Sequence, residues 1–339
     1  IERIVSVEVA AYLWAILSII TAVGLLKIII LKTFTKFIVN VLSGLLFLYS
    51  GLQIYGVNIN KNFNPTFSFI EQSQSVQFTK IFTTEKLFKQ IKDSKKIRST
   101  NNHEWADPFI FKEGAETYCF VEDYDWSKGK GSIAAYKISN GAPINLGIVL
   151  EEAFHLSFPY IFRHESKIYM LPESADNMDI RIYESLEFPT KWKLKTIIKE
   201  NVSAADSMIF WRNGFWWLFS NINPIGGRDC CSELSIFYTD NPIDGKWVPH
   251  EKNPVIFDPS FARNGGMVLD HDSLYRVGQI QTFGTYGGGG VSINQIVELT
   301  TSSYKEQSVL KLYPEFQQGI KGAHHLHSDG GVTAFDFLK

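Results

Sequence analysis

From residue 105 onward, apolar runs that follow a small or polar residue recur along the chain. The first copy is residues 105–111, Trp-Ala-Asp-Pro-Phe-Ile-Phe, and weaker copies lie downstream. The equivalent positions are Asp107, Ser157, Asp206, Arg263 and His325. These positions are 50, 49, 57 and 62 residues apart. A period near ~50 residues is typical of a β-propeller, in which each repeat forms one four-stranded sheet.

Within each repeat, short alternating or apolar segments follow one another between Gly, Asn, Asp and Pro turns. In the third repeat these segments are residues 215–219, 234–238 and the stretch from Trp247 onward, with a turn at Asn213-Gly214. Short strands without a long helix between them predict an all-β ring. We therefore expect a five-bladed β-propeller over residues 104–339.

The last repeat is too short for four strands of its own, since only residues 332–338 follow its first strand. An open ring would leave unpaired strand edges, which are prone to aggregate. Residues 67–69 and 76–82 also alternate, and we expect them to complete the fifth blade. Residues 57–103 are thus predicted to be a linker with strands that close the ring.

Two long apolar stretches precede the repeats. Residues 9–26 and 37–55 contain no charged residue, and a bilayer core takes about 20 residues to span. We expect residues 1–56 to form a two-helix transmembrane hairpin; a hydrophobic helix pair docked on soluble protein is the alternative. Lys32 and Lys36 lie in the short connection, which favours a cytoplasmic loop. The propeller is then expected on the extracytoplasmic or lumenal side of the membrane.

Composition narrows the range of partners. The net charge is −2 and the isoelectric point is near 6.5, which argues against nucleic acid because its binding needs a basic face. Aromatic residues make up 14% of the chain, which suits packed sheets and also sugar binding. Three cysteines are too few and badly spaced for a disulfide framework or a zinc site.

In a propeller the first strand of each blade lines the central channel, so the equivalent positions converge. Asp107, Ser157, Asp206, Arg263 and His325 are therefore expected around the channel mouth, with His155, Glu173 and His324 near them. For the two aspartates, capping of a turn or of a strand start is the structural alternative. Arg263 suits a fork for phosphate or carboxylate, or an ion pair with one of the aspartates inside the channel.

Several of these motifs resemble a known family. They are Trp105-Ala-Asp-Pro-Phe, His155-Leu-Ser-Phe-Pro-Tyr, Met170-Leu-Pro-Glu-Ser174, Ala205-Asp-Ser and His324-His325-Leu-His327-Ser-Asp-Gly. Together they resemble the N-terminal domain of glucosamine inositolphosphorylceramide transferases and its bacterial relatives, over residues 104–338. The chain is also similar to the five-bladed propeller glycoside hydrolases of the arabinanase, xylosidase and invertase group.

The resemblance to the hydrolases implies roles for carboxylates. Those enzymes use a first-blade Asp as base or nucleophile, a third-blade Glu as acid and a second-blade Asp that tunes the site. This chain keeps Asp107, has Ser157 at the second position and has Asp206 rather than Glu at the third; Glu173 could supply the missing acid. The candidate catalytic residues are therefore Asp107, Glu173 and Asp206. The candidate substrate-binding residues are His155, Arg263 and His325.

No cofactor is identified from the sequence, and a divalent cation near His325 stays open. A fifth-blade His is associated with a bound cation in some of the hydrolases that the chain resembles. Alternate residues of a strand share a face, so His325 and His327 should point together while His324 points away.

The function we favour from the sequence is a membrane-anchored, carbohydrate-active propeller that binds a glycan or glycolipid in a glycosyl-transfer system. Two alternatives remain open. One is a glycoside hydrolase that uses the channel carboxylates, and the other is a non-catalytic scaffold that binds glycans or proteins. The expected partners are a glycan or glycolipid and the membrane, and no nucleic acid.

Overall fold

The computed structural model describes residues 66–71, 94–99, 102–139, 142–223, 230, 232–270, 273–281, 289–314, 318–329 and 331–337. All of them belong to the compact unit from Phe63 to Lys339. The predicted hairpin at residues 1–56 and the predicted strand at residues 76–82 lie outside the described residues. Among the described ranges, no helix has both the length and the apolar character needed to cross a membrane.

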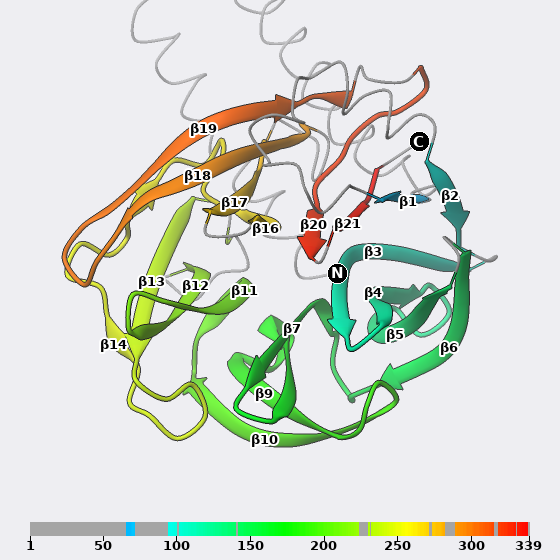
Figure 1. Cartoon of the computed structure of the whole chain (residues 1–339), viewed down its shortest axis with the longest axis horizontal. Coiled ribbons are helices and arrows are strands. Elements are labelled where there is room, and N and C mark those ends of the chain that lie inside the picture. The colour runs from blue at the N-terminus through cyan, green and yellow to red at the C-terminus, as the bar shows by residue number, and fades with distance from the viewer. Residues whose placement is uncertain are drawn as a thin grey trace, which may run out of the picture. The chain divides into compact units, whose positions relative to one another are not determined.

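Three of the repeats each form a separate antiparallel sheet, and Figure 1 shows these sheets arranged about a common middle. The first contains β3 His103–Glu113, β4 Glu116–Asp125, β5 Lys130–Ser139 and β6 Ala142–Leu150. The second contains β7 Ser157–His164, β8 Lys167–Glu173, β9 Asp179–Glu187 and β10 Lys191–Glu200, with the 3-10 helix η1 Ala175–Asn177 after β8. The third contains β11 Ser203–Arg212, β12 Phe215–Asn223, β13 Glu233–Thr239, β14 Val248–Pro249 and β15 Ile256–Phe257.

The remaining strands form one eight-stranded sheet in the order β19-β18-β17-β16-β20-β21-β1-β2. One half contains β16 Asn264–Asp270, β17 Ser273–Gln279, β18 Val291–Leu299 and β19 Tyr304–Leu312. The other half contains β20 Leu326–Asp329, β21 Val332–Phe335, β1 Thr66–Glu71 and β2 Lys95–Arg98. The prediction of five separate blades is wrong, because the described strands make four sheets. A parallel pairing of Val268 on β16 with Ser328 on β20 joins the fourth and fifth repeats.

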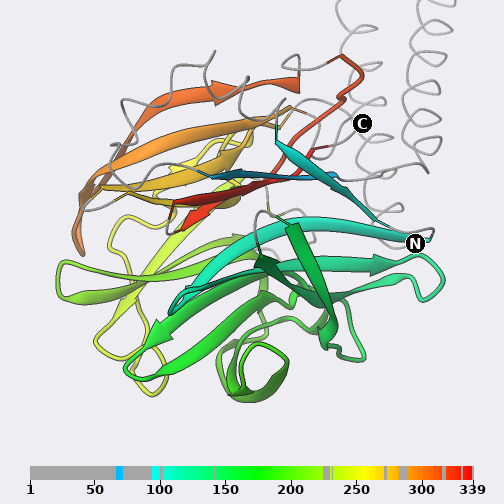
Figure 2. The ribbon, with the colours of Figure 1, turned by 45° about the vertical axis from the view of Figure 1, so that its right-hand side comes forward.

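The strand predicted at residues 67–69 is confirmed. It lies in β1, which pairs with β21 through Phe69 and Ala334, and Figure 2 shows the blue β1 beside the red β21 strand. The strand beyond β1 is β2, where Ile97 faces Phe67. A segment from before the repeats thus completes the last meander of the chain.

Strands β3, β7, β11 and β16 each carry a β-bulge near their start. The bulged residues Asp107, Phe158 and Asp206 have φ angles of 51°, 47° and 49°. A positive φ is uncommon for residues other than glycine, and a bulge re-aims the side chain it carries. The register makes Phe158, rather than Ser157, equivalent to the two aspartates. The equivalence predicted for Ser157 is therefore wrong by one residue: Ser157 is the last residue paired before the bulge, as Ala106 and Ala205 are, and the local sequence does not mark where the bulge falls.

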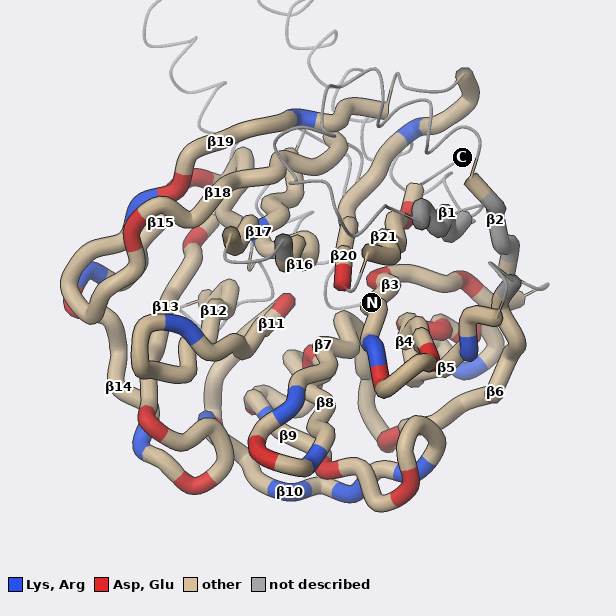
Figure 3. The backbone as a smooth tube through the Cα atoms, viewed as in Figure 1, with Lys and Arg blue, Asp and Glu red and all other residues tan. Residues whose placement is uncertain are grey.

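The outer strands are exposed and charged. Residues of β10 are exposed or half-buried throughout, and Figure 3 shows lysine, arginine and acidic positions mixed along this outer edge. By contrast, β11 is buried over its first eight residues. Burial thus falls from the inner strand β11 to an outer strand such as β10. The candidate site residues are therefore sought at the inner strands.

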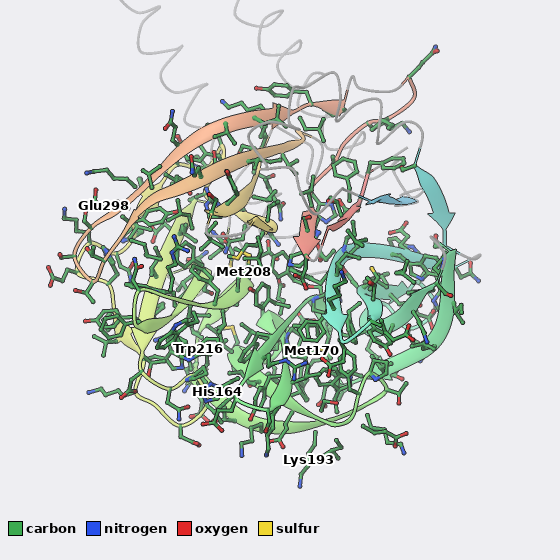
Figure 4. All side chains as sticks on the ribbon, viewed as in Figure 1. His164, Met170, Lys193, Met208, Trp216 and Glu298 are labelled. Atoms are coloured by element: carbon green, nitrogen blue, oxygen red, sulfur yellow. The ribbon has the colours of Figure 1, made fainter. Side chains whose placement is uncertain are left out.

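Apolar side chains fill the spaces between neighbouring sheets. Phe188, in the turn between β9 and β10, and Trp192 on β10 pack against Phe120 of the first sheet, with ring centroids 5.9 Å from that of Phe120 in both cases. Met208 is fully buried and points toward the middle, whereas Lys193 projects outward (Figure 4). The inner strands are held rigidly by this packing, which positions the polar groups at their ends.

Candidate functional site

A buried cluster of acids and an arginine joins three of the repeats. Nε of Arg263 donates a 2.6 Å hydrogen bond to Oδ2 of Asp206, and its Nη2 lies 3.8 Å from Oε2 of Glu173. Gln279 on β17 donates through Nε2 to the same Asp206 oxygen at 3.0 Å. The backbone N–H of Asp206 donates to Oε2 of Glu173 at 3.3 Å. Of the two alternatives for Arg263, the structure shows the ion pair inside the ring.

The ionisation of Asp206 depends on the charges around it. Burial raises the pKa of Asp206 well above its ordinary value, Arg263 opposes that rise, and Glu173 and Asp107 add to it by repulsion. Asp206 is 2% exposed, Arg263 3% and Glu173 6%. Arg263 therefore compensates buried negative charge that would otherwise be costly.

A second network surrounds Asp107. His324 lies between two carboxylates, with Nε2 3.3 Å from Oδ1 of Asp107 and Nδ1 3.0 Å from Oδ2 of Asp336. The backbone N–H of Asp107 donates to Oδ2 of Asp336 at 3.1 Å. The backbone N–H of Phe158 donates to Oδ2 of Asp107 at 3.3 Å. Asp107 thus connects the first, second and last repeats.

Burial by itself would lower the pKa of His324, but Asp336 and Asp107 raise it well above its ordinary value. Asp107, His324 and Asp336 offer ligand atoms within 4.8 Å of one another, as a metal site would. An imidazolium that donates from both ring nitrogens has no lone pair for a metal. A protonated His324 between the two carboxylates and a cation held by all three residues are therefore alternative states of this trio.

His325 is completely buried and lies beside the same network. Its ring stands edge-on to Phe109 and Phe158, with centroid distances of 4.5 Å and 5.3 Å. Neither ring nitrogen has a hydrogen-bond partner among the described residues. Burial lowers the pKa of His325 well below its ordinary value, so the ring is neutral. A bare, neutral imidazole could hold a cation or a polar ligand group, and that role stays a prediction.

His325 and His327 share a face, as predicted, because both rings contact Phe109. The Nδ1 atom of His327 accepts the backbone N–H of Ile110 at 3.2 Å. His324 points to the other side, where it meets Asp107. It is therefore His324, rather than His325, that forms the ion pair with Asp107.

His155 reaches the site from the segment before β7. Its Nδ1 accepts the backbone N–H of Gly131 at 2.8 Å, and its Nε2 lies 3.4 Å from Oε1 of Glu122. Burial raises the pKa of Glu122 well above its ordinary value, and Asp107 and Glu173 raise it further by repulsion. The Glu122 side chain is 13% exposed. Glu122 therefore lies near the charges of both networks and is more exposed than their members.

The structure brings all six predicted site residues into one region, and the acidic position on β11 near the middle can be followed in Figure 3. Sequence reasoning missed Asp336 and Gln279 as members, and Glu122 was not among the six candidates. A signal for Glu122 existed: it faces Ala106 across β3 and β4 as Glu173 faces Ser157 across β7 and β8. No local pattern marks Asp336, which lies in an apolar stretch. The functional roles predicted for the six residues stay predictions.

Comparison with known proteins gives a family. The model of the family "Glucosamine inositolphosphorylceramide transferase 1, N-terminal" matches residues 92–328. Glucosamine inositolphosphorylceramide transferase 1 of Oryza sativa subsp. japonica is 38% identical over 246 residues, which are 68% of this chain and 32% of the rice protein. The Arabidopsis thaliana protein of that name is 37% identical over 209 residues, 60% of this chain and 27% of its own length. The chain spans about a third or less of these relatives.

Solved structures with a similar fold are carbohydrate-active enzymes. The catalytic domain of a GH62 alpha-L-arabinofuranosidase of Coprinopsis cinerea aligns with a TM-score of 0.50 and 9% identity, covering 81% of this chain and 98% of that chain. An exo-beta-1,3-galactanase from Phanerochaete chrysosporium aligns with a TM-score of 0.50 and 9% identity, covering 69% of this chain and 60% of the galactanase chain. At this identity the likeness concerns the fold alone.

Proposed function

Because the chain belongs to the family of glucosamine inositolphosphorylceramide transferase 1 N-terminal domains, we propose that it is the sugar-binding propeller of a glycosyl-transfer system. The observation that carries this proposal is the convergence of Asp107, Asp206 and Arg263 from three repeats next to the more exposed Glu122 and His155. Sugar hydroxyls both donate and accept hydrogen bonds, so a rigid set of carboxyl, imidazole and amide groups suits them.

The ligand that we propose is the headgroup of a glycosylated inositolphosphorylceramide, the lipid in the name of the relatives. Arg263 is unsuited to the phosphate of such a headgroup, since it is buried and bonded to Asp206. We expect it to fix the inner strands, while Glu122 and His155 contact the sugar. Fold does not by itself determine function, so the binding must be measured.

We propose that residues 1–56 anchor the propeller on the extracytoplasmic or lumenal side of a membrane. The support is their two uncharged runs and the lysines between them. Asn201-Val-Ser is a sequon, and Asn201 is exposed in the turn after β10. On expression in a eukaryotic secretory system, a glycosidase-sensitive mass increase that Asn201→Gln abolishes is expected. The orientation would be contradicted if Asn201 carried no glycan and protease added on the cytoplasmic side cleaved the propeller.

Binding of the full chain to a glycan array and to the soluble, lipid-free headgroup tests the proposed function. A zwitterionic detergent without sugar is required, because alkyl glycosides would compete. Asp206→Asn should weaken binding by about tenfold or more, whereas Glu306→Gln should not. Glu306 is a matched control: its carboxylate is bonded to the buried Arg276 at 2.7 Å, but on the outer strand β19. Equal binding by all three proteins would contradict the proposal.

Glycoside hydrolysis is a second candidate, and one observation favours it. Glu122, a carboxyl with a raised pKa, lies close enough to Asp107 for that residue to raise it further, and a protonated acid beside a second carboxylate is what hydrolysis needs. Against it, Asp107, Glu173 and Asp206 are each 6% exposed or less, whereas hydrolysis needs a second carboxylate that reaches the substrate. Chromatography of the bound oligosaccharides separates the two: shortened sugars with the wild type and intact sugars with Glu122→Gln would establish hydrolysis.

A further inference from the structure

An exposed aromatic pair stands beside the acidic end of the first sheet. Trp126, in the turn after β4, is 49% exposed and packs edge-on to Tyr124 at 4.9 Å. The Tyr124 ring in turn lies 5.8 Å from that of His155. The backbone N–H of Trp126 donates to the carbonyl of Asn102 at 2.9 Å. The indole is therefore held in place while much of its surface faces water.

Two carboxyl groups lie on the same face of this sheet. Glu104 on β3 is directly opposite Tyr124 on β4, and Glu122 is two residues before Tyr124. Residues opposite one another and residues two apart share a face. Glu104 also makes a side-chain hydrogen bond with Trp126. The two carboxyl groups therefore border the aromatic pair.

A glycine makes room for His155 beside these groups. Gly131 on β5 lies opposite Tyr124, and a Cβ atom there would be 2.6 Å from the carbonyl oxygen of Leu156, 2.8 Å from Oε1 of Glu122 and 2.9 Å from Cε1 of His155. Contacts below 3.0 Å cannot be accommodated against backbone. His155 thus occupies the space of the missing side chain, where it reaches Glu122 at 3.4 Å.

We propose that Trp126, Tyr124, Glu104, Glu122 and His155 form a subsite, called here the rim subsite, for one uncharged hexopyranose ring. The inference rests on the proposed sugar-binding function and names the residues that contact the sugar. The apolar face of the ring lies on Trp126, and its hydroxyls bond to the two carboxyls and to His155. Such a combination of an aromatic platform and a few polar groups is what small-ligand sites use.

The ionisation of the two acids favours an uncharged ring over a cationic one. Burial raises the pKa of Glu104 to about 7, and the hydrogen bond with Trp126 opposes that rise. Burial also raises the pKa of Glu122, with Asp107, Glu173 and Glu104 adding to it and His324 opposing it. A protonated carboxyl can donate to a hydroxyl as well as accept from one. A cation would be served better by ionised carboxylates.

Saturation-transfer NMR titrations of the full chain with methyl hexopyranosides test the rim subsite. The probes are the methyl glycosides of glucose, galactose and mannose, and methyl glucosaminide as the cationic comparison. Trp126→Ala should lower the affinity for the best neutral methyl glycoside by about tenfold or more. Trp211→Ala should bind that sugar as the wild type does. Trp211 is a matched control because it is 54% exposed and also packs against an aromatic ring, that of Trp216 at 5.8 Å.

Variants of Glu122 separate a contact role from a structural one. Glu122→Gln keeps a donor and an acceptor and should retain neutral-sugar binding, whereas Glu122→Leu should lose it. Three outcomes would each overturn the rim subsite. Trp126→Ala could bind neutral sugars as the wild type does, both tryptophan variants could lose affinity equally, or the glucosaminide could bind much more tightly than the neutral sugars. If Trp126→Ala retains binding but Asp206→Asn loses it, the proposed function survives without the rim subsite. If the wild type binds none of the sugars or headgroups, both are overturned.

Discussion

Arg263 and Asp206 are 57 residues apart in the chain, yet Nε of Arg263 lies 2.6 Å from Oδ2 of Asp206. Both side chains are 4% exposed or less, and Gln279 donates to the same oxygen. The pair links the third repeat to the fourth at the inner end of both sheets. Because both side chains are shielded from water, losing one partner should measurably lower the stability of the protein.

The first prediction concerns this ion pair. Arg263→Met should lower the free energy of unfolding by about 3–5 kcal/mol, because it leaves a buried carboxylate without its partner. The double variant Arg263→Met/Asp206→Leu should recover part of the loss, since no buried charge remains. Urea unfolding followed by circular dichroism measures both. Equal stability of the wild type and Arg263→Met would mean that the ion pair contributes nothing.

The second prediction uses His324, whose pKa is raised by Asp336 and Asp107 against the effect of burial. The folded pKa exceeds the unfolded value near 6.5, so the stabilisation is complete below about pH 6.5 and is lost as the pH rises through the folded pKa. The stability difference between the wild type and His324→Gln should therefore shrink at high pH. Thermal unfolding from about pH 6 to about pH 9 tests this. A difference that stays constant would show that His324 is not protonated in the folded protein.

The third prediction concerns Glu104, whose pKa burial raises from 4.5 to about 7. The folded protein binds more protons here than the unfolded chain between these values, so stability should fall as the pH rises through this window. In Glu104→Gln, the fall in stability that Glu104 causes between these pH values should be absent. Glu165→Gln, at a side chain that is 79% exposed, is the control and should leave the pH profile unchanged. Identical profiles for the wild type and Glu104→Gln would refute the shift.

The fourth prediction compares two buried histidines that contact the same Phe109 ring. His327→Phe leaves the backbone N–H of Ile110 unpaired and should cost about 1–3 kcal/mol. His325→Phe removes two nitrogens that have no hydrogen-bond partner among the described residues, so it should cost less. Denaturant unfolding of the two variants side by side gives the comparison. A larger cost for His325→Phe would indicate that its nitrogens hold a ligand or a water molecule.

The fifth prediction concerns the joint between β16 and β20. Gly266 has a φ of 110°, and a Cβ atom there would lie 2.3 Å from the carbonyl oxygen of Leu326. Gly266→Ala should therefore push the two strands apart and cost several kcal/mol. Gly319→Ala is the control: its φ is 86°, but a Cβ atom there meets nothing within 4 Å, so only the backbone strain of about 1–3 kcal/mol applies. If both variants lose a similar free energy of unfolding, the cost comes from the positive φ angle alone and not from a clash with Leu326.

Much of the fold could be predicted from local sequence patterns. Period-two alternation and turn residues act over a few positions, so the strands of the repeats and the turn at Asn213-Gly214 follow from them; both turn residues have a positive φ. The anchor positions Asp107 and Asp206 also follow from the repeat. The strand at residues 67–69 follows from the need to complete the last meander.

What only the tertiary structure decided is which neighbouring residue faces the middle. A bulge exchanges the faces of a strand at the residue where it falls, and in β7 that residue is Phe158 rather than Ser157. His324 rather than His325 meets Asp107, and Asp336 joins them from a separate strand end. The pairing of β16 with β20 that merges two repeats is likewise set by packing around the ring. These contacts join residues far apart in the chain, and no local periodicity carries that information.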